Sequence, residues 1–211
     1  SSYMVSGVGS SLEPDFDPGD LRIPSGGDDP DSLPNPIIAH EELLDNHVNG
    51  SLSTIHGDLH PGNIMIGPNQ SAFLIDFAHT REGHTFLDWA TLEVSLLSDT
   101  IMSKNGESWE DVRRVLQQVI HLNGCPPMMD TDKTADSSLA AIVKIREIAK
   151  ECLISEDQWS EYFVALAFCS LRAVTWKTIP LAGRRLMFLV SALAIHELRG
   201  RFRHNSESGS P

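Results

Sequence analysis

From Phe86 to about Gly200 the chain repeats apolar residues at helical spacing, and this pattern limits the fold more than any other feature. Within each segment the apolar residues recur three or four positions apart, as on the buried face of an amphipathic helix. Pro126-Pro127 and Pro180 interrupt the pattern, and Ser155 with Gln158 forms a capping box. We therefore predict five helices, over residues 86–102, 108–122, 137–153, 155–176 and about 181–200.

The preceding segment predicts one short helix and one β-hairpin. The helix is expected over Ile37–Val48, where apolar residues form a stripe. Short apolar runs at Ile64–Ile66 and Ala72–Ile75 flank Gly67-Pro68-Asn69-Gln70, which is typical of a hairpin with a four- or five-residue turn. A polar loop precedes the hairpin and another follows it. The predicted fold class is α+β, mainly α, with this small hairpin and about five helices after it.

The two ends of the chain differ in composition from its middle. Residues 1–36 are rich in Ser, Gly, Pro and Asp and carry seven acids against one base, Arg22. Such a segment buries too little apolar surface to offset its ordering entropy, so it is expected to be a mostly disordered tail. An acidic docking arm is the alternative. Residues 37–200 are predicted to form the folded domain, and residues 201–211 a polar, frayed tail.

Charge and apolar content exclude several classes of protein. The 211 residues carry 29 acids and 16 bases, a net charge of −13, which disfavours binding to nucleic acid or to anionic membranes. No signal peptide is visible, and the apolar runs are shorter than the roughly 20 residues of a membrane span. The three cysteines are far apart, without a CxxC pair, so a reducing, cytoplasmic setting is expected.

Polar side chains gather in the loops on either side of the hairpin. The first loop holds Asp58 and Asn63, and the far strand of the hairpin ends at Asp76. The hairpin is therefore expected to bring these three residues together at one of its ends. One carboxylate could accept a hydroxyl proton, while an amide and a second carboxylate hold Mg²⁺ on nucleotide phosphates. These hard oxygen ligands suit Mg²⁺ better than zinc.

The sequence "HGDLHPGN", with "LIDFA" following the hairpin, resembles the catalytic and metal-binding loops of the aminoglycoside phosphotransferase and choline kinase-like family. The spacing H-x-D-x-x-x-x-N followed by I-D-F is a kinase signature. The match is strong over about forty residues, and the later helices agree in kind without carrying a motif. The resemblance implies the C-terminal lobe of a protein kinase-like fold, with ATP and Mg²⁺ as cofactors and a hydroxyl of a small molecule as acceptor.

Residue roles follow from the same resemblance. Asp58 would be the catalytic base, and Asn63 and Asp76 the magnesium and cofactor ligands. His56 would pack the catalytic loop, and Asp88 in "FLDWA" would brace the backbone of that loop. The remaining polar residues near the loops, as candidates for contact with substrate, are His60, His79, Arg81 and His84.

The N-terminal lobe of a kinase is not recognisable in this sequence. Residues 1–55 contain no lysine to pair with nucleotide phosphates, and "SGVGSS" lacks the strand and lysine of a phosphate loop. The chain is therefore interpreted as a fragment of a larger multidomain protein, or as a fold reduced to its C-terminal lobe. An inactive pseudokinase that serves as a regulatory binding module stays open.

Two further interpretations of the polar residues also stay open. A metal-dependent hydrolase could use His56, Asp58, His60 and Asp76, or the polar residues could only cap turns. Outside the loops, Glu93 is expected to face solvent or to pair with a base on its helix. The residues expected in the core include Met128-Met129, Trp176, Phe188 and Cys169.

Overall fold

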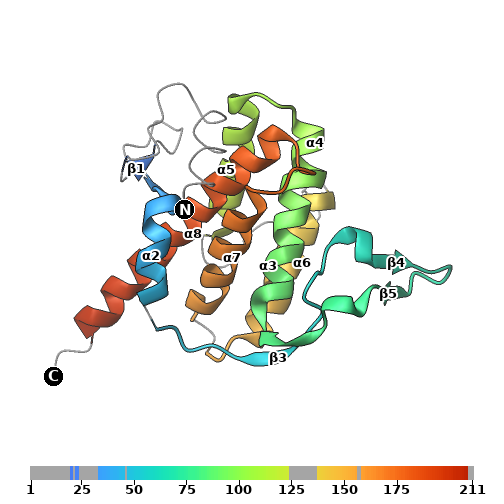
Figure 1. The fold of residues 1–211 in the computed structure, drawn as a ribbon, viewed down its shortest axis with the longest axis horizontal. Coiled ribbons are helices and arrows are strands. Elements are labelled where there is room, and N and C mark those ends of the chain that lie inside the picture. Colours follow the sequence, from blue (N-terminus) through green and yellow to red (C-terminus); the bar gives the residue numbers. More distant parts are fainter. Residues whose placement is uncertain are drawn as a thin grey trace.

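The computed structural model describes residues 20, 22–23, 33–45, 47–123, 137–155 and 158–208. In this part of the chain helices dominate, and short antiparallel strand pairs accompany them, as the predicted α+β, mainly α class requires (Figure 1). Met128-Met129, predicted as core, and Cys125 lie outside the described residues.

The helices predicted after the hairpin are all present. The helix predicted over 86–102 is continuous, but its middle segment (η3) has π-helical and not α-helical hydrogen bonding. The bounds are α3 Phe86–Ser95, η3 Leu96–Ile101, α4 Met102–Asn105, α5 Trp109–Asn123, α6 Ser137–Cys152, α7 Ser160–Ala173 and α8 Leu181–Ser208.

Two predicted helix ends are wrong. Helix α7 begins at Ser160 and not at Ser155, because the chain before it forms a turn, with the Gln158 backbone N–H donating to the Ser155 carbonyl at 2.9 Å. Helix α8 continues past Gly200 to Ser208, so the predicted polar tail begins too early. No proline lies between Gly200 and Ser208, and one glycine costs a helix only about 1 kcal/mol.

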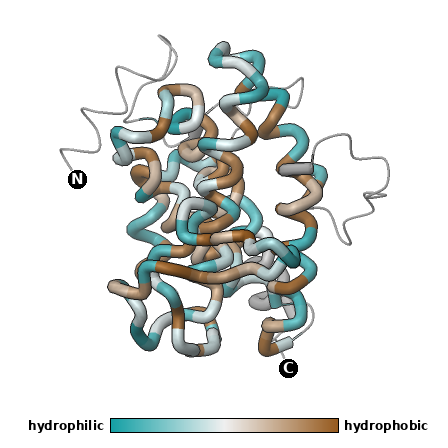
Figure 2. The backbone as a smooth tube through the Cα atoms, turned by 90° about the vertical axis from the view of Figure 1, so that its right-hand side faces the viewer, coloured by the Kyte–Doolittle hydropathy of each residue, from teal (hydrophilic) through white to brown (hydrophobic). Residues whose placement is uncertain are grey.

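Helices α7 and α8 pack along each other, and α3, α5 and α2 (Pro36–Asp45) pack around this pair (Figure 1). Hydrophobic and hydrophilic stretches alternate along the tube, as expected of helices that bury one side (Figure 2). The largest side chains that this arrangement removes from solvent include Phe86, Leu97, Leu116, Tyr162 and Phe188.

The described residues just before α2 pack onto the fold. Strand β1 (Arg22–Ile23) pairs with β2 (Leu33–Pro34), and the Leu33 side chain is only 4% exposed. Asn35 caps α2, because its Oδ1 accepts the Ile37 N–H at 3.1 Å. The predicted boundary at residue 36 is therefore too late; apart from Asp20 and the residues named here, residues 1–36 lie outside the described part of the chain.

Four of the described strands, β3 to β6, form two nested antiparallel pairs that frame the polar loops. The predicted hairpin is confirmed as β4 (Ile64–Ile66) with β5 (Ala72–Leu74). A second pair, β3 (Leu52–Ile55) with β6 (Arg81–His84), was not expected. Because β3 precedes the first loop and β6 follows the second, this pair holds the two loops side by side.

Candidate functional site

The first loop, residues 56–63, is fixed to α3 through its backbone. The Asp88 carboxylate accepts the His56 N–H at 2.6 Å and the Gly57 N–H at 2.9 Å. Asp88 lies in the first turn of α3, where the helix dipole also favours a negative charge. Phe86, the first residue of α3, is fully buried and anchors this end of the helix in the core. The loop therefore takes its position from a core helix.

His56 connects the first loop to the second. The ring is buried, its Nε2 lies 2.8 Å from the Ile75 carbonyl, and it packs against Phe77 with 5.2 Å between ring centroids. The carbonyl oxygen can only accept, so Nε2 carries the proton. The residue next to Ile75 is Asp76, so this imidazole sets the start of the second loop.

Gly57 allows the two loops to approach closely. Its φ is +82°, and a Cβ here would lie 2.4 Å from the His79 carbonyl oxygen and 2.7 Å from Arg81 Nη1. The same Arg81 nitrogen donates to the His79 carbonyl at 3.0 Å. His79 and Arg81 thus support the back of the first loop.

Asn63 lies where the first loop enters the hairpin. Its side-chain Nδ2 donates to the Asp58 backbone carbonyl at 2.9 Å, and its backbone carbonyl accepts the Ile75 N–H at 3.0 Å. The structure therefore brings Asp58, Asn63 and the start of the second loop to one end of the hairpin. The hydrogen bond uses the amide nitrogen and leaves the amide oxygen as the atom that a cation could bind.

Asp76 holds an uncommon backbone conformation. Its φ and ψ are both 62°, in the left-handed region, and its side chain is exposed. Within the described residues its carboxylate makes no hydrogen bond or ion pair. Non-glycine residues in this region cost about 1–3 kcal/mol and gather at functional sites. Mg²⁺ is usually bound through one or two carboxylates together with waters and phosphate oxygens, and Asp76 is an exposed carboxylate of this kind, next in the chain to Ile75, which is hydrogen-bonded to the Asn63 backbone.

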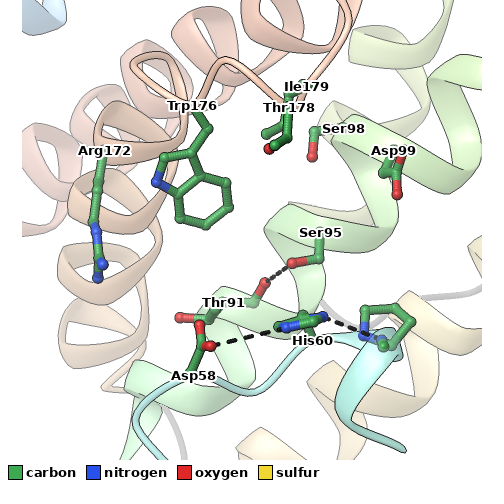
Figure 3. A pocket seen from close by; sticks show the side chains of 12 residues that line it. Asp58, His60, Thr91, Ser95, Ser98, Asp99, Arg172, Trp176, Thr178 and Ile179 are labelled. Carbon is green, nitrogen blue, oxygen red and sulfur yellow. Dashed lines mark hydrogen bonds and ion pairs between the residues drawn. The ribbon is translucent and has the colours of Figure 1, made fainter. Parts of the chain in front are cut away.

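A cavity of about 610 Å³ opens beside the first loop (Figure 3). Three parts of the chain form it: the first loop, the α3–η3 helix and the connection from α7 to α8. The lining residues are Asp58, His60, Pro61, Gly62, Thr91, Ser95, Ser98, Asp99, Arg172, Trp176, Thr178 and Ile179.

Two of the residues singled out from the sequence line this cavity, Asp58 and His60. The Gly62 N–H donates to His60 Nδ1 at 3.1 Å, so the proton of the neutral ring is on Nε2. That nitrogen lies 3.9 Å from Asp58 Oδ2, and both side chains are partly exposed. The imidazole therefore presents its N–H to the Asp58 carboxylate.

The other three candidate substrate residues do not line the cavity. His79 and Arg81 support the first loop, as described above. His84 ends β6, where it packs against Phe86 with 5.8 Å between ring centroids. Burial lowers the pKa of His84, and the nearby Glu161 carboxylate opposes this shift only in part.

Sequence reasoning missed the far walls of the cavity. Thr91, Ser95 and Ser98 are small hydroxyl residues at helical spacing in a mainly apolar helix, and this signal could have identified them. Trp176 was predicted as core but is only half-buried and lies at the cavity (Figure 3). Neither Trp176 nor Arg172 carries a local sequence signal for a site.

The ligand set of the hydrolase interpretation is not assembled. Among the described residues, no three His, Cys, Asp or Glu side chains converge as metal ligands. His56 is turned inward onto Ile75, and His60 Nδ1 is occupied by Gly62. A zinc site needs three or four convergent protein ligands, so this arrangement does not provide one.

Comparison with known proteins identifies one family. The model of the Ternary complex associated domain 9 family matches residues 29–175, which is more than half of the chain. No curated protein and no solved structure matches the chain significantly. No helix in the described residues is both long and apolar enough to cross a membrane.

Proposed function

The chain belongs to the Ternary complex associated domain 9 family, and we propose that it is the catalytic lobe of a Mg²⁺- and ATP-dependent phosphotransferase that acts on a hydroxyl of a small molecule. One observation carries this proposal: the cavity has Asp58 in its wall, and Asn63 and Asp76 lie at the adjoining end of the hairpin. The resemblance of "HGDLHPGN" and "LIDFA" to kinase-like loops supports it independently.

Asp58 is the residue that would accept the acceptor's hydroxyl proton. Its carboxylate reaches the cavity, while its backbone is held by Asn63 and its loop by Asp88. The His60 Nε2–H, whose nitrogen is 3.9 Å from Asp58 Oδ2, would act on the carboxylate by electrostatic attraction, since this distance is too long for a direct hydrogen bond. A base held in this way removes the proton as the hydroxyl oxygen becomes a nucleophile.

Asn63 and Asp76 would hold Mg²⁺ through one amide and one carboxylate oxygen. Mg-ATP, when bound, supplies the phosphoryl group, whose bond to ADP breaks as the acceptor oxygen bonds to phosphorus. The chain's own contribution is to position the hydroxyl and to hold the charges, which is the main protein contribution in this class of reaction.

The test is an Asp58→Asn variant, assayed for transfer of labelled γ-phosphate to a panel of polyhydroxy compounds. Turnover should fall by about 10²- to 10⁴-fold, the usual contribution of a general base. The melting temperature should not change, because the Asp58 side chain is partly exposed. Asp45→Asn, a matched substitution at the exposed end of α2, should leave both quantities unchanged. Turnover that survives Asp58→Asn would refute the base assignment.

A second candidate function is a regulatory binding module without catalysis. The observation that favours it is the exposed apolar surface of the hairpin, since large exposed apolar patches mark interaction sites. The exposed apolar side chains on and next to the hairpin include Met65, Ile66, Phe73, Leu74 and Phe77. The rest of a larger multidomain protein would be the natural partner.

Binding of nucleotide separates the two candidates. A ligand that binds only the folded state raises its stability, by about 2.7 kcal/mol at a hundredfold excess over Kd. Millimolar Mg-ATP should therefore raise the melting temperature of the wild-type chain, and Asp76→Asn should remove the increase. No increase in the wild type would favour the binding module.

A further inference from the structure

An unpaired guanidinium lies at one side of the cavity. Arg172, in the last turn of α7, places its guanidinium carbon 5.8 Å from the centroid of the Trp176 ring. Stacking on an indole orients a guanidinium without neutralising it. Within the described residues Arg172 makes no ion pair, so its charge is available to a ligand that enters the cavity (Figure 3).

The α3–η3 wall offers mainly hydrogen-bond acceptors. The Thr91 hydroxyl donates to the Leu87 carbonyl at 2.7 Å, and the Ser95 hydroxyl donates to the Thr91 carbonyl at 2.9 Å. Both hydroxyls have therefore used their protons and present lone pairs. A ligand that meets this wall must bring donors, and hydroxyl groups on a ring supply them.

Ser98 extends this wall and lacks a partner. Its side chain is fully buried, and its Oγ makes no hydrogen bond with any of the described residues. Figure 3 shows this oxygen directed toward the cavity. A buried hydroxyl without a partner is unfavourable, and a ligand hydroxyl would supply the missing hydrogen bond.

The half-buried indole of Trp176 forms another, flat side of the cavity. An aromatic face packs well against the C–H face of a ring, while the hydroxyls of that ring point sideways toward polar walls. The volume of about 610 Å³ falls within the usual range for small-molecule sites.

Building on the proposed phosphotransferase function, we propose that the acceptor is a polyhydroxylated ring that carries an anionic group, such as a sugar acid or a sugar phosphate. The anion pairs with Arg172, the ring lies on Trp176, and the hydroxyls meet Ser95 and Ser98. One hydroxyl then lies at Asp58. Arg172 is accordingly a specificity residue for this acceptor.

The experiment compares binding of matched neutral and anionic compounds by calorimetry, without nucleotide: glucose against glucuronate and glucose 6-phosphate, and myo-inositol against its monophosphate. At least one anionic compound should bind about ten- to a hundredfold more tightly than its neutral partner, because charge-assisted hydrogen bonds are among the stronger polar contacts. Arg172→Gln should lower the affinity for that compound to the affinity measured for its neutral partner. The stability of the Arg172→Gln variant should equal that of the wild type, because Arg172 is exposed.

Arg113→Gln is the matched control. Arg113 also lies over an indole, that of Trp109 at 6.0 Å, but it is not among the residues that line the cavity. This variant should keep the preference for the anion. Equal affinity for neutral and anionic partners in the wild type, or an anion preference that survives Arg172→Gln, would overturn the inference.

Phosphoryl transfer separates this inference from the proposed function. If the anionic compound binds through Arg172 but Mg-ATP does not phosphorylate it, the acceptor site stands and the phosphotransferase proposal fails. If neutral compounds are phosphorylated equally well by the wild type and by Arg172→Gln, the phosphotransferase stands and the anion site fails.

Discussion

Glu93 of α3 joins three helices inside the core. Its carboxylate accepts from Arg146 of α6, at 3.0 Å from Nε and 2.6 Å from Nη2, and from the Tyr162 hydroxyl of α7 at 2.5 Å. All three side chains are buried, so the expectation that Glu93 faces solvent is wrong. The helical pattern places Glu93 next to buried Val94, but the base that pairs with it comes from a distant helix.

This cluster changes the ionisation of its members. Burial is the largest single influence on the pKa of Arg146 and lowers it, but the attraction and hydrogen bonds to Glu93, together with Tyr162, raise this pKa above its ordinary value. Burial raises the pKa of Tyr162, and the Glu93 charge raises it further. The guanidinium therefore stays charged and the phenol stays protonated, so both can donate to the carboxylate throughout the physiological range.

Glu93→Ala should lower the free energy of unfolding by about 3–5 kcal/mol, because it leaves the Arg146 charge buried without its partner. The control is Glu147→Ala, which removes an exposed carboxylate that pairs with Lys144 on the surface of α6. Surface pairs of this kind contribute about 0–1 kcal/mol. Urea unfolding measures both values, and a small loss for Glu93→Ala would mean that water reaches the cluster.

At the scale of elements, the π-helical segment η3 is fitted to the start of α8. A Cβ on Gly183 would lie 2.3 Å from the Ser98 carbonyl oxygen, so α8 approaches the segment more closely than any other residue type would allow. Ser98 also lines the cavity, and π-helical turns are frequent at functional sites. The contact between these two elements therefore sets the shape of the polar wall.

Gly183→Ala should destabilise the protein by about 1–3 kcal/mol, the usual cost of overpacking a close contact. Gly200→Ala, in the same helix, is the matched control, because nothing lies within 4 Å of the added methyl group. That change should stabilise the helix by about 0.5–1 kcal/mol. Chemical denaturation compares the two, and a gain in stability for Gly183→Ala would contradict the close packing.

Local sequence patterns predicted the helices and the hairpin because each depends on neighbouring residues. The apolar period of α3, and the turn between Ile66 and Ala72, are visible within a few positions. Strand β6 was missed, since "REGH" has no apolar alternation and becomes a strand only through its pairing with Leu52–Ile55. The π-helical turn over Leu96–Ile101 was missed because its apolar spacing is that of an ordinary α-helix.

The same distinction applies to the candidate site. Asp58, Asn63 and Asp76 could be located because one hairpin joins them and its register is readable. Arg172 and Trp176 could not, since they are more than a hundred residues from Asp58 and reach the cavity only through the packing of α7 against α3. Sequence reasoning therefore located the reactive loop without the walls that select its ligand.

At the scale of the whole molecule, two groups of apolar residues differ in their exposure. One set fills the helical core, where Phe188 is 1% exposed. The other lies on the β4–β5 hairpin, which projects from the helices (Figure 1), and there Phe73 is 56% exposed. The helices should therefore supply the stability of the fold, while Asn63 and Asp76 lie at the base of a hairpin on which the core does not depend.

Matched Phe→Ala substitutions test this division. Phe188→Ala should cost about 3–5 kcal/mol of unfolding free energy, because it removes a buried ring from the core. Phe73→Ala should cost less than about 1 kcal/mol, since its ring loses little burial on unfolding. Urea unfolding at low protein concentration measures both. A large loss for Phe73→Ala would show that the hairpin surface is covered in solution, and a loss that grows with protein concentration would identify the cover as a second copy of the chain.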